Sequence, residues 1–288
     1  MSGLEAPRPG TSTLWDILRP LHLTRVVDIG ANPIDGDPPY QPMLRDGLCR
    51  ITGFEPQAEA LAALLRRKGP LETYLPYAVG DGNVHTLNIC AASGMTSLYE
   101  PDPATLEIFA ALKPLGQVVN RLPIQTRRLD DIEEIEALDF LKIDIQGAEL
   151  SVFRHGKQKL SDAIAIQVEV SFMALYRDQP GHGEVDIELR AQGFVPHCFA
   201  AVKRWPIAPL VVGNNDRQPL NQLLEADIVY MRDIRKPEAL DQEQLKHLAL
   251  VAHHCYGSFD LAVRCLWLLE QRGLLDKEDR MKYLGSLG

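Results

Sequence analysis

Acidic residues follow several short apolar runs of this sequence, at positions where a parallel sheet would gather them. Asp28 ends the first run, Glu55 follows the second, Asp81 the third and Asp144 the fourth. Open α/β sheets bind ligands at the carboxyl ends of their strands, so we expect these acids around one cleft. Carboxylates in such a cleft can accept hydrogen bonds from ribose hydroxyls and from the amino group of adenine.

The type of ligand follows from what accompanies these acids. Glu55 is the expected ribose ligand, and Asp81 is placed to bind the adenine amino group. Gly30 lets the backbone approach a ligand that a Cβ would block. A dinucleotide would need the GxGxxG turn and an open helix N-terminus, whereas position 32 is Asn and position 34 is Ile. The pattern therefore favours S-adenosylmethionine, which has a ribose and an adenine but no phosphate, over a nicotinamide cofactor.

The elements that must position these residues are strands and helices in alternation. Apolar, β-rich runs predict strands at 25–29, 49–54, 71–79, 140–145 and 163–170, and helical stretches lie between them at 57–67 and 148–154. This rhythm predicts an α/β, Rossmann-like, doubly wound and mostly parallel sheet. Runs at 193–199 and 226–231 could add an antiparallel pair at the sheet edge.

The sequence predicts three structural parts. Residues 1–24 form an N-terminal helical segment, and residues 25–235 form the main domain with an insertion at 82–127. Residues 236–288 form a C-terminal helical hairpin or tail, with helices at 240–254 and 258–272 that end before Gly257 and Gly273. The insertion is either a substrate-facing lid or a structural flap. The hairpin packs on the main domain or contacts a protein partner or a second copy.

Five ordered motifs make the chain resemble one family. They are Val27-Asp28-Ile29-Gly30-Ala31-Asn32, Gly53-Phe54-Glu55-Pro56, Ala78-Val79-Gly80-Asp81, Arg128-Leu129-Asp130-Asp131 and the run from Asp139 through Lys142 and Asp144 to Glu149. The chain resembles the FkbM family of class I S-adenosylmethionine-dependent methyltransferases. The resemblance implies methyl transfer to a hydroxyl of a sugar, glycan or polyketide. It also implies a cofactor site formed by Asp28, Gly30, Asn32, Glu55, Pro56, Gly80, Asp81 and Asp144. The family usually has a glycine at position 34, whereas here the next glycine is Gly36.

A hydroxyl acceptor needs a base or a metal ion, and three acids are candidates for the catalytic role: Asp144, Glu149 and Glu169. Glu149 could equally be an acid that stabilises the first turn of a helix. The same three residues could hold Mg²⁺, although nothing in their spacing demands it. A methyltransferase-like module that binds cofactor or partner without chemistry is the alternative function.

Composition narrows the class of partner. The formal net charge of -9 argues against a nucleic-acid ligand, which usually meets a basic stripe. Five scattered cysteines without a CxxC pair predict neither a zinc site nor a disulfide framework. The chain shows no signal peptide and no apolar stretch of the ~18 residues that a membrane span needs, so we expect a cytoplasmic protein that acts on a small-molecule or glycan acceptor.

Overall fold

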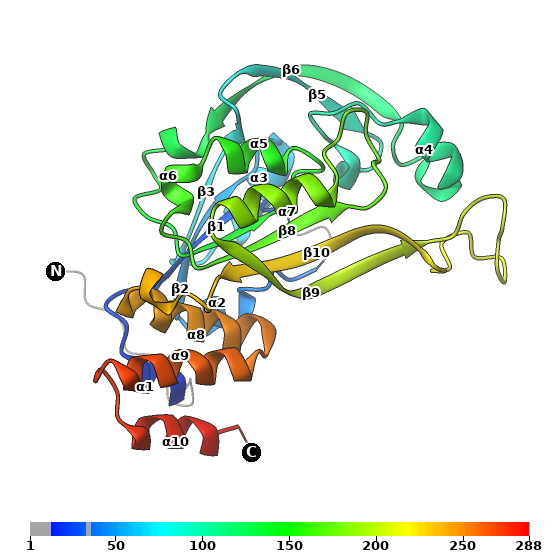
Figure 1. Ribbon diagram of the computed structural model, residues 1–288. Coiled ribbons are helices and arrows are strands. Elements are labelled where there is room, and N and C mark those ends of the chain that lie inside the picture. The colour runs from blue at the N-terminus through cyan, green and yellow to red at the C-terminus, as the bar shows by residue number, and fades with distance from the viewer. Residues whose placement is uncertain (1–12, 33–35, 288) are drawn as a thin grey trace.

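The computed structural model describes residues 13–32 and 36–287, and its centre is a seven-stranded sheet (Figure 1). The strand order is β3-β2-β1-β7-β8-β10-β9, in which β10 alone runs antiparallel to its neighbours. The strands are β1 (Thr24–Ile29), β2 (Cys49–Phe54), β3 (Glu72–Leu75), β7 (Phe140–Ile143), β8 (Ala165–Ser171), β9 (Phe194–Trp205) and β10 (Gln222–Arg232). The predicted α/β class is confirmed, and the antiparallel pair at the edge is present in longer form.

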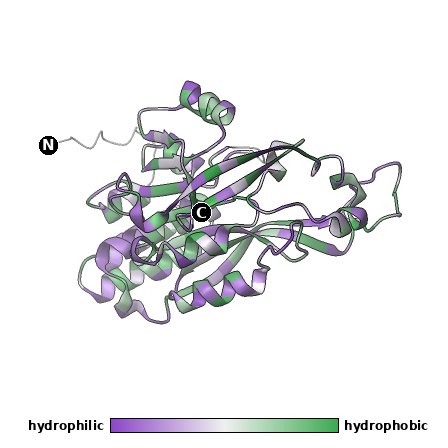
Figure 2. Ribbon diagram, turned by 90° about the horizontal axis from the view of Figure 1, so that it is seen from above, coloured by the Kyte–Doolittle hydropathy of each residue, from purple (hydrophilic) through white to green (hydrophobic). Residues whose placement is uncertain are grey.

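Alternate residues of the central strands feed two separate hydrophobic cores, which is why both faces of the sheet carry helices. Val27 of β1 packs in a cluster with Leu150 and Phe153, whereas Val26 packs in another with residues of the C-terminal helices. The first face is covered by α5 (Glu149–Arg154), α6 (Lys157–Leu160) and α7 (His182–Ala191) (Figure 1). Figure 2 shows hydrophilic and hydrophobic segments alternating along the helices, as expected when one side of a helix is buried.

The second face is covered by helices from both ends of the described chain. They are α1 (Thr13–Leu18), α2 (Gln41–Arg45), α8 (Gln242–Tyr256), α9 (Phe259–Gln271) and α10 (Lys277–Gly285). Leu248 and Val251 of α8 share a cluster with Phe140 and Val229 of the sheet. The predicted helices at 240–254 and 258–272 are therefore part of the main core. Contact of these helices with a partner stays a prediction, and α10 was not predicted at all.

The prediction of one strand over 71–79 is wrong. Pro76 interrupts it, since proline has no N–H to donate to a ladder. The chain forms β3 in the main sheet and then β4 (Ala78–Gly80) in a second sheet of order β4-β6-β5, with β5 at Val84–Cys90 and β6 at Val118–Arg128. Helix α3 (Ala58–Arg67) connects β2 to β3.

The predicted insertion at 82–127 contains most of this second sheet and a short helical segment (Figure 1). Its helical turns are η1 (Ser93–Met95), α4 (Pro103–Ile108) and η2 (Ala110–Leu112), while η3 (Leu129–Asp131) and η4 (Pro237–Ala239) lie later in the chain. Phe109 and Leu112 pack with Tyr176 and Leu224, so the insertion is anchored on the sheet by a third core. No helix of the described ranges is long and apolar enough to cross a membrane.

Candidate functional site

A cavity of about 700 Å³ lies at the carboxyl ends of β1, β2 and β7. This volume is in the range of sites for small molecules. Six of the residues predicted for the cofactor line it: Asp28, Gly30, Asn32, Glu55, Pro56 and Asp144. Residues of the insertion, of β8 and of the β9–β10 hairpin line much of the rest, so the insertion faces the cavity as the lid alternative requires.

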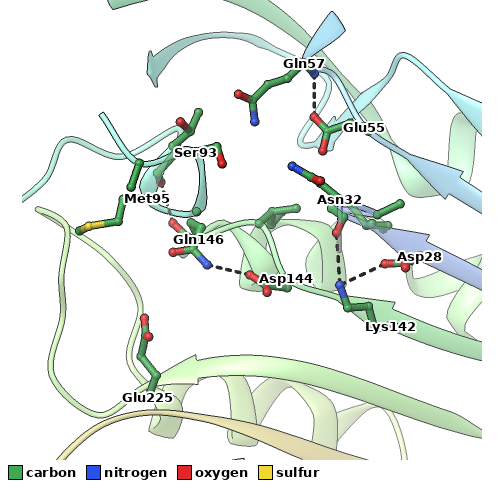
Figure 3. Close-up of a pocket in the computed structure, with 18 of the residues that line it drawn as sticks. Asp28, Asn32, Glu55, Gln57, Ser93, Met95, Lys142, Asp144, Gln146 and Glu225 are labelled. Carbon is green, nitrogen blue, oxygen red and sulfur yellow. Dashed lines mark hydrogen bonds and ion pairs between the residues drawn. The ribbon is translucent and has the colours of Figure 1, made fainter. Parts of the chain in front are cut away.

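Asp28 is a buried acid that is held within the protein. Its Oδ2 accepts a hydrogen bond of 2.6 Å from the Tyr40 hydroxyl, and its Oδ1 lies 3.3 Å from Lys142 Nζ. Lys142 also donates to the Gly30 carbonyl oxygen at 3.2 Å (Figure 3). Burial alone would lower the pKa of Lys142, but the carboxylates of Asp28 and Asp144 outweigh it and raise that pKa. The protonated lysine thus ties the turn after β1 to β7.

Glu55 is 3% exposed and still has an oxygen to offer. Its Oε1 accepts a hydrogen bond of 2.7 Å from the Gln57 backbone N–H, and Oε2 has no donor among the residues that the structure describes. Burial raises the pKa of this carboxyl group. Figure 3 shows Asn32, Glu55 and Gln57 gathered at one side of the cavity. We call Asp28, Asn32 and Glu55, from the ends of β1 and β2, the cofactor side.

Position 30 must be a glycine because the backbone of Asp144 lies too close to leave room for a side chain. Gly30 has a φ of +81°, and a Cβ added there would lie 1.9 Å from the Asp144 carbonyl oxygen. We predicted that the Gly30 backbone lies close to a ligand, and the structure shows it close to the Asp144 backbone at the end of β7. Gly30 also lines the cavity. Gly36, the next glycine after the family position, lines the cavity too. The stretch 33–35 between them lies outside the described residues.

Asp144 and Glu169 meet at one side chain, that of Gln146. The Gln146 Nε2 donates to Asp144 Oδ1 and to Glu169 Oε2, both at 2.8 Å. The Gln146 Oε1 in turn accepts from the Tyr176 hydroxyl at 3.1 Å. Glu169 is completed by Lys203, whose Nζ lies 2.9 Å from Oε1. Of these two predicted catalytic acids, only Asp144 lines the cavity.

Glu149 serves the loop that carries Gln146. Its Oε1 accepts from the backbone N–H groups of Ile145 at 2.9 Å and Gly147 at 3.1 Å. Burial raises its pKa to about 7. Together with Lys203 on Glu169, these bonds occupy oxygens that a Mg²⁺ site would need. The observed geometry fits a positioning role for Glu149.

Gly80 and Asp81 lie apart from the cavity, because β4 leaves the main sheet to pair with β6. A Cβ at Gly80 would come within 3.0 Å of Thr126. Asp81 accepts hydrogen bonds from Asn83 and contacts His85 Nε2 at 2.8 Å. Partial burial would raise the pKa of Asp81, yet the hydrogen bonds of His85 and Asn83 lower it. Neither residue lines the cavity as described, and the adenine role predicted for Asp81 has no support in this placement.

Several residues that line the cavity were missed in the sequence. They form the acceptor side, which we define as Gln146, Gln167, Lys203, Trp205 and Glu225, from β7 to β10. The predicted strands at 193–199 and 226–231 were too short to include Lys203, Trp205 and Glu225. These three residues lay in the segment predicted between the two strands. The signal for Gln146 was the Gln-Gly pair after β7, where both residues have positive φ.

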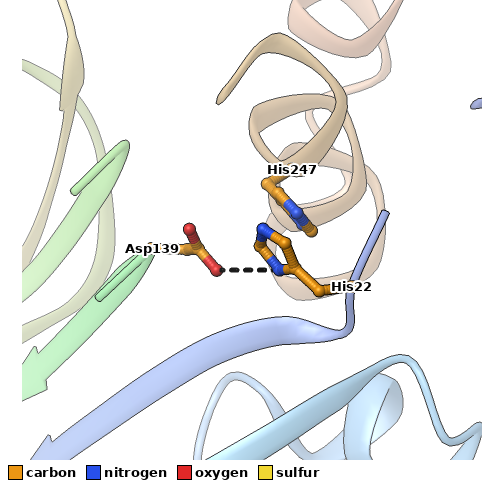
Figure 4. Close-up of side chains that lie close together, drawn as sticks. All are labelled: His22, Asp139 and His247. Carbon is orange, nitrogen blue, oxygen red and sulfur yellow. Dashed lines mark ion pairs between the residues drawn. The ribbon is translucent and has the colours of Figure 1, made fainter. Parts of the chain in front are cut away.

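A second cluster of possible metal ligands lies at the amino ends of β1 and β7, at the opposite edge of the sheet from the cavity. Ligand atoms of His22, Asp139 and His247 lie within 4.8 Å of one another, with His22 between the other two (Figure 4). Arg25 already binds both oxygens of Asp139, at 2.9 and 2.6 Å, and the two imidazole rings are stacked with centroids 4.4 Å apart. Stacked rings aim their lone pairs in parallel, which does not suit one ion, so we interpret the cluster as a structural link between β1, β7 and α8.

Comparison with known proteins identifies the family. Two solved structures that the fold resembles are magnesium protoporphyrin IX methyltransferase from Synechocystis PCC 6803, with bound SAM, and precorrin-6y C5,15-methyltransferase from Geobacter metallireducens GS-15. The first has a TM-score of 0.39 and 8% identity over 77% of this chain and 74% of that chain. The second has a TM-score of 0.36 and 12% identity over 79% and 94%. No curated protein matches the chain. The sequence model of the methyltransferase FkbM domain matches residues 28–196, which is more than half of the 288 residues. The chain belongs to the FkbM methyltransferase family.

Proposed function

We propose that this protein transfers a methyl group from S-adenosylmethionine to a hydroxyl group of a sugar, glycan or polyketide-type acceptor. The observation that carries the proposal is Glu55, a buried carboxylate with one oxygen left for a ligand inside the cavity. An acid at the end of the second strand is placed to accept hydrogen bonds from ribose hydroxyls. The family assignment independently supports methyl transfer.

The charge of the cavity supports a cationic cofactor. Six carboxylates line it, from Asp28, Asp37, Glu55, Asp144, Glu225 and Asp227, against the two ammonium groups of Lys142 and Lys203. S-adenosylmethionine supplies a methyl group already activated by the positive charge on its sulfur. The chain's own task is therefore to hold the reactants in line and to handle the proton of the acceptor. Asn32 and Glu55 would hold the adenosyl part, and Asp144 would orient the acceptor hydroxyl from the β7 end.

The acceptor side supports a polyhydroxylated molecule. Its polar groups are the amides of Gln146 and Gln167 and the charged ends of Lys203 and Glu225, and Trp205 adds an aromatic wall. Several hydrogen-bonding groups beside one aromatic ring suit a ligand with hydroxyls on an apolar frame. The negative net charge is consistent with an acceptor other than a nucleic acid.

The test is the affinity for S-adenosylhomocysteine, the demethylated cofactor, measured by calorimetry. The Glu55→Gln substitution removes an acceptor oxygen from the ribose site and should weaken binding about 10- to 100-fold, the cost of a lost hydrogen bond to a charged group. Glu59→Gln, the same change on the exposed start of α3, is the matched control and should leave affinity unaltered.

Three results would count against the proposal. Thermal stabilisation of the wild-type protein by NAD but not by S-adenosylhomocysteine would point to another cofactor. Equal affinity of the Glu55→Gln and wild-type proteins would remove Glu55 from the site. Binding of the cofactor without methyl transfer to any member of a panel of sugars, glycosides and polyketides would favour a binding module over an enzyme.

A further inference from the structure

Glu225 is a carboxylate of β10 that faces the cavity from the acceptor side, away from Glu55 (Figure 3). Only 6% of the residue is exposed. The side-chain oxygens of Glu225 have no hydrogen-bond donor among the residues that the structure describes. The ammonium of Lys203 lies 3.9 Å from Oε2 of Glu225, at the outer limit of an ion pair. A buried acid that keeps its lone pairs for the cavity is placed to act on whatever fills it.

The other acids near the acceptor are engaged by the protein. Glu169 accepts from both Gln146 and Lys203, and Glu149 accepts from two backbone N–H groups. Asp144 accepts from Gln146 and stands at the β7 end beside the cofactor side. Asp227 lines the cavity two residues after Glu225, and it too has an interaction within the protein. Glu169, Glu149 and Asp144 each accept at least one hydrogen bond, whereas no residue that the structure describes donates one to Glu225.

We propose that Glu225 is the general base that removes the proton from the acceptor hydroxyl, an inference that rests on the function proposed above. In this step the Glu225 carboxylate takes the hydroxyl proton while the acceptor oxygen bonds to the methyl carbon. The electron pair of the breaking carbon–sulfur bond stays on sulfur. Glu225 is then a neutral carboxylic acid, and it returns its proton to water on the open side of the cavity.

The surroundings of Glu225 suit this role electrostatically. Burial, with smaller contributions from Asp144, Glu149 and Asp227, raises the pKa of Glu225 to about 7 against the opposing effect of the Lys203 ammonium. A base whose pKa lies near the working pH combines a large ionised fraction with good proton affinity. Lys203 is the group that keeps part of the population ionised, because its ammonium lies between Glu169 and Glu225. An ordinary exposed glutamate, with a pKa of about 4.3, would be a weaker base.

The backbone fixes the direction of Glu225. The carbonyl oxygen of the preceding Leu224 accepts hydrogen bonds from the N–H groups of Phe172, at 2.8 Å, and Met173, at 3.3 Å. Glu225 itself pairs with Ser171 of β8 and with Lys203 of β9, so strands hold it on both sides. A base fixed by two neighbouring strands loses little freedom when the acceptor binds.

The experiment compares the wild-type protein with Glu225→Gln and with Glu238→Gln, an exposed glutamate of η4 that serves as control. The carboxyl carbons of ¹³C-labelled glutamate are titrated by NMR, which reads the protonation of Glu225 without any turnover. S-adenosylhomocysteine affinity is measured by calorimetry on the same samples. Methyl transfer is then measured with the sugar and polyketide panel.

Glu149 also has a pKa of about 7, so we expect two glutamate carboxyl resonances that titrate near pH 7 in the wild type and in Glu238→Gln, one of which is lost in Glu225→Gln. Methyl transfer should fall about 10²- to 10⁴-fold in Glu225→Gln, the usual contribution of a general base. Cofactor affinity should stay within about threefold, since no bond of Glu225 to the cofactor side is lost.

The failures are distinguishable. If the wild-type protein does not bind S-adenosylhomocysteine, the proposed function itself is wrong. Normal binding together with an ordinary titration of Glu225, or with transfer by Glu225→Gln within about threefold of wild type, would overturn the role of Glu225 and leave the cofactor site standing.

Discussion

The hydroxyl of Tyr40 donates a hydrogen bond of 2.6 Å to Oδ2 of Asp28, and both side chains are buried. The bond joins the residue just before α2 to the end of β1. It leaves Lys142 to face the other oxygen of Asp28. Both carboxylate oxygens of Asp28, the acid of the family's first motif, therefore interact with side chains of the protein.

Replacement of Tyr40 by Phe removes this donor from a buried carboxylate. We expect the free energy of unfolding to fall by about 1–3 kcal/mol, the cost of leaving such a group without its hydrogen bond. Urea unfolding followed by circular dichroism measures it. Tyr99→Phe is the matched control, because the Tyr99 hydroxyl donates no hydrogen bond to the described part of the chain. Equal destabilisation by the two substitutions would show that the Tyr40–Asp28 bond is not the cause.

Replacement of Gly30 by Ala tests the turn after β1. The added Cβ would lie 1.9 Å from the Asp144 carbonyl oxygen at a φ of +81°, so β1 and β7 must move apart. We expect a loss of about 1–3 kcal/mol in unfolding free energy from overpacking, together with weaker S-adenosylhomocysteine binding. The control is Gly183→Ala in α7, where a Cβ meets nothing within 4 Å. Unaltered binding and stability in Gly30→Ala would contradict the tight contact.

Replacement of His247 by Asn tests the link between α8 and the sheet through pH. His247 is hydrogen-bonded through Nδ1 to Thr24 Oγ1 at 2.9 Å, and burial lowers its pKa to about 4. An unfolded histidine has a pKa of about 6.5, so the unfolded chain binds the proton first. This contribution to stability is present above pH 6.5 and is lost as the pH falls towards 4.

Other groups titrate in the same window, so the measurement is a difference between two proteins. His254 also has its pKa lowered to about 4 by burial, whereas the raised pKa values of Glu149 and Glu225 act in the opposite direction. Between pH 6.5 and 4.5 the wild type should lose about 2 kcal/mol more than His247→Asn. Urea denaturation at both pH values provides the number, and parallel losses in the two proteins would refute the assignment.

The sequence was sufficient for the parts of the site that follow strand ends. Asp28, Glu55 and Asp144 meet in one cavity because parallel strands deliver consecutive acids to one edge. It was insufficient where the chain leaves that pattern. Asp81 looked like a further member of the series, but Pro76 sends its strand into another sheet.

Residues from distant strands were beyond the reach of local patterns. Glu225 and Lys203 are cross-strand partners near the loop end of the β9–β10 hairpin, and the approach of Lys203 to Glu169 depends on where β9 and β10 join the sheet. The distribution of hydrogen-bond donors among Glu149, Glu169 and Glu225 likewise exists only in the folded chain. Spacing alone could nominate acids, whereas three-dimensional packing decides which of them keeps an oxygen for a ligand.

The placement of α8 over the sheet has a consequence for biosynthesis. Leu248 and Val251, which bury one side of β1, β2 and β7, are synthesised only after every strand of the sheet. A nascent chain therefore exposes one apolar face of its sheet until α8 has been made. A stop codon placed just before α8 should yield aggregating fragments instead of a shorter working protein.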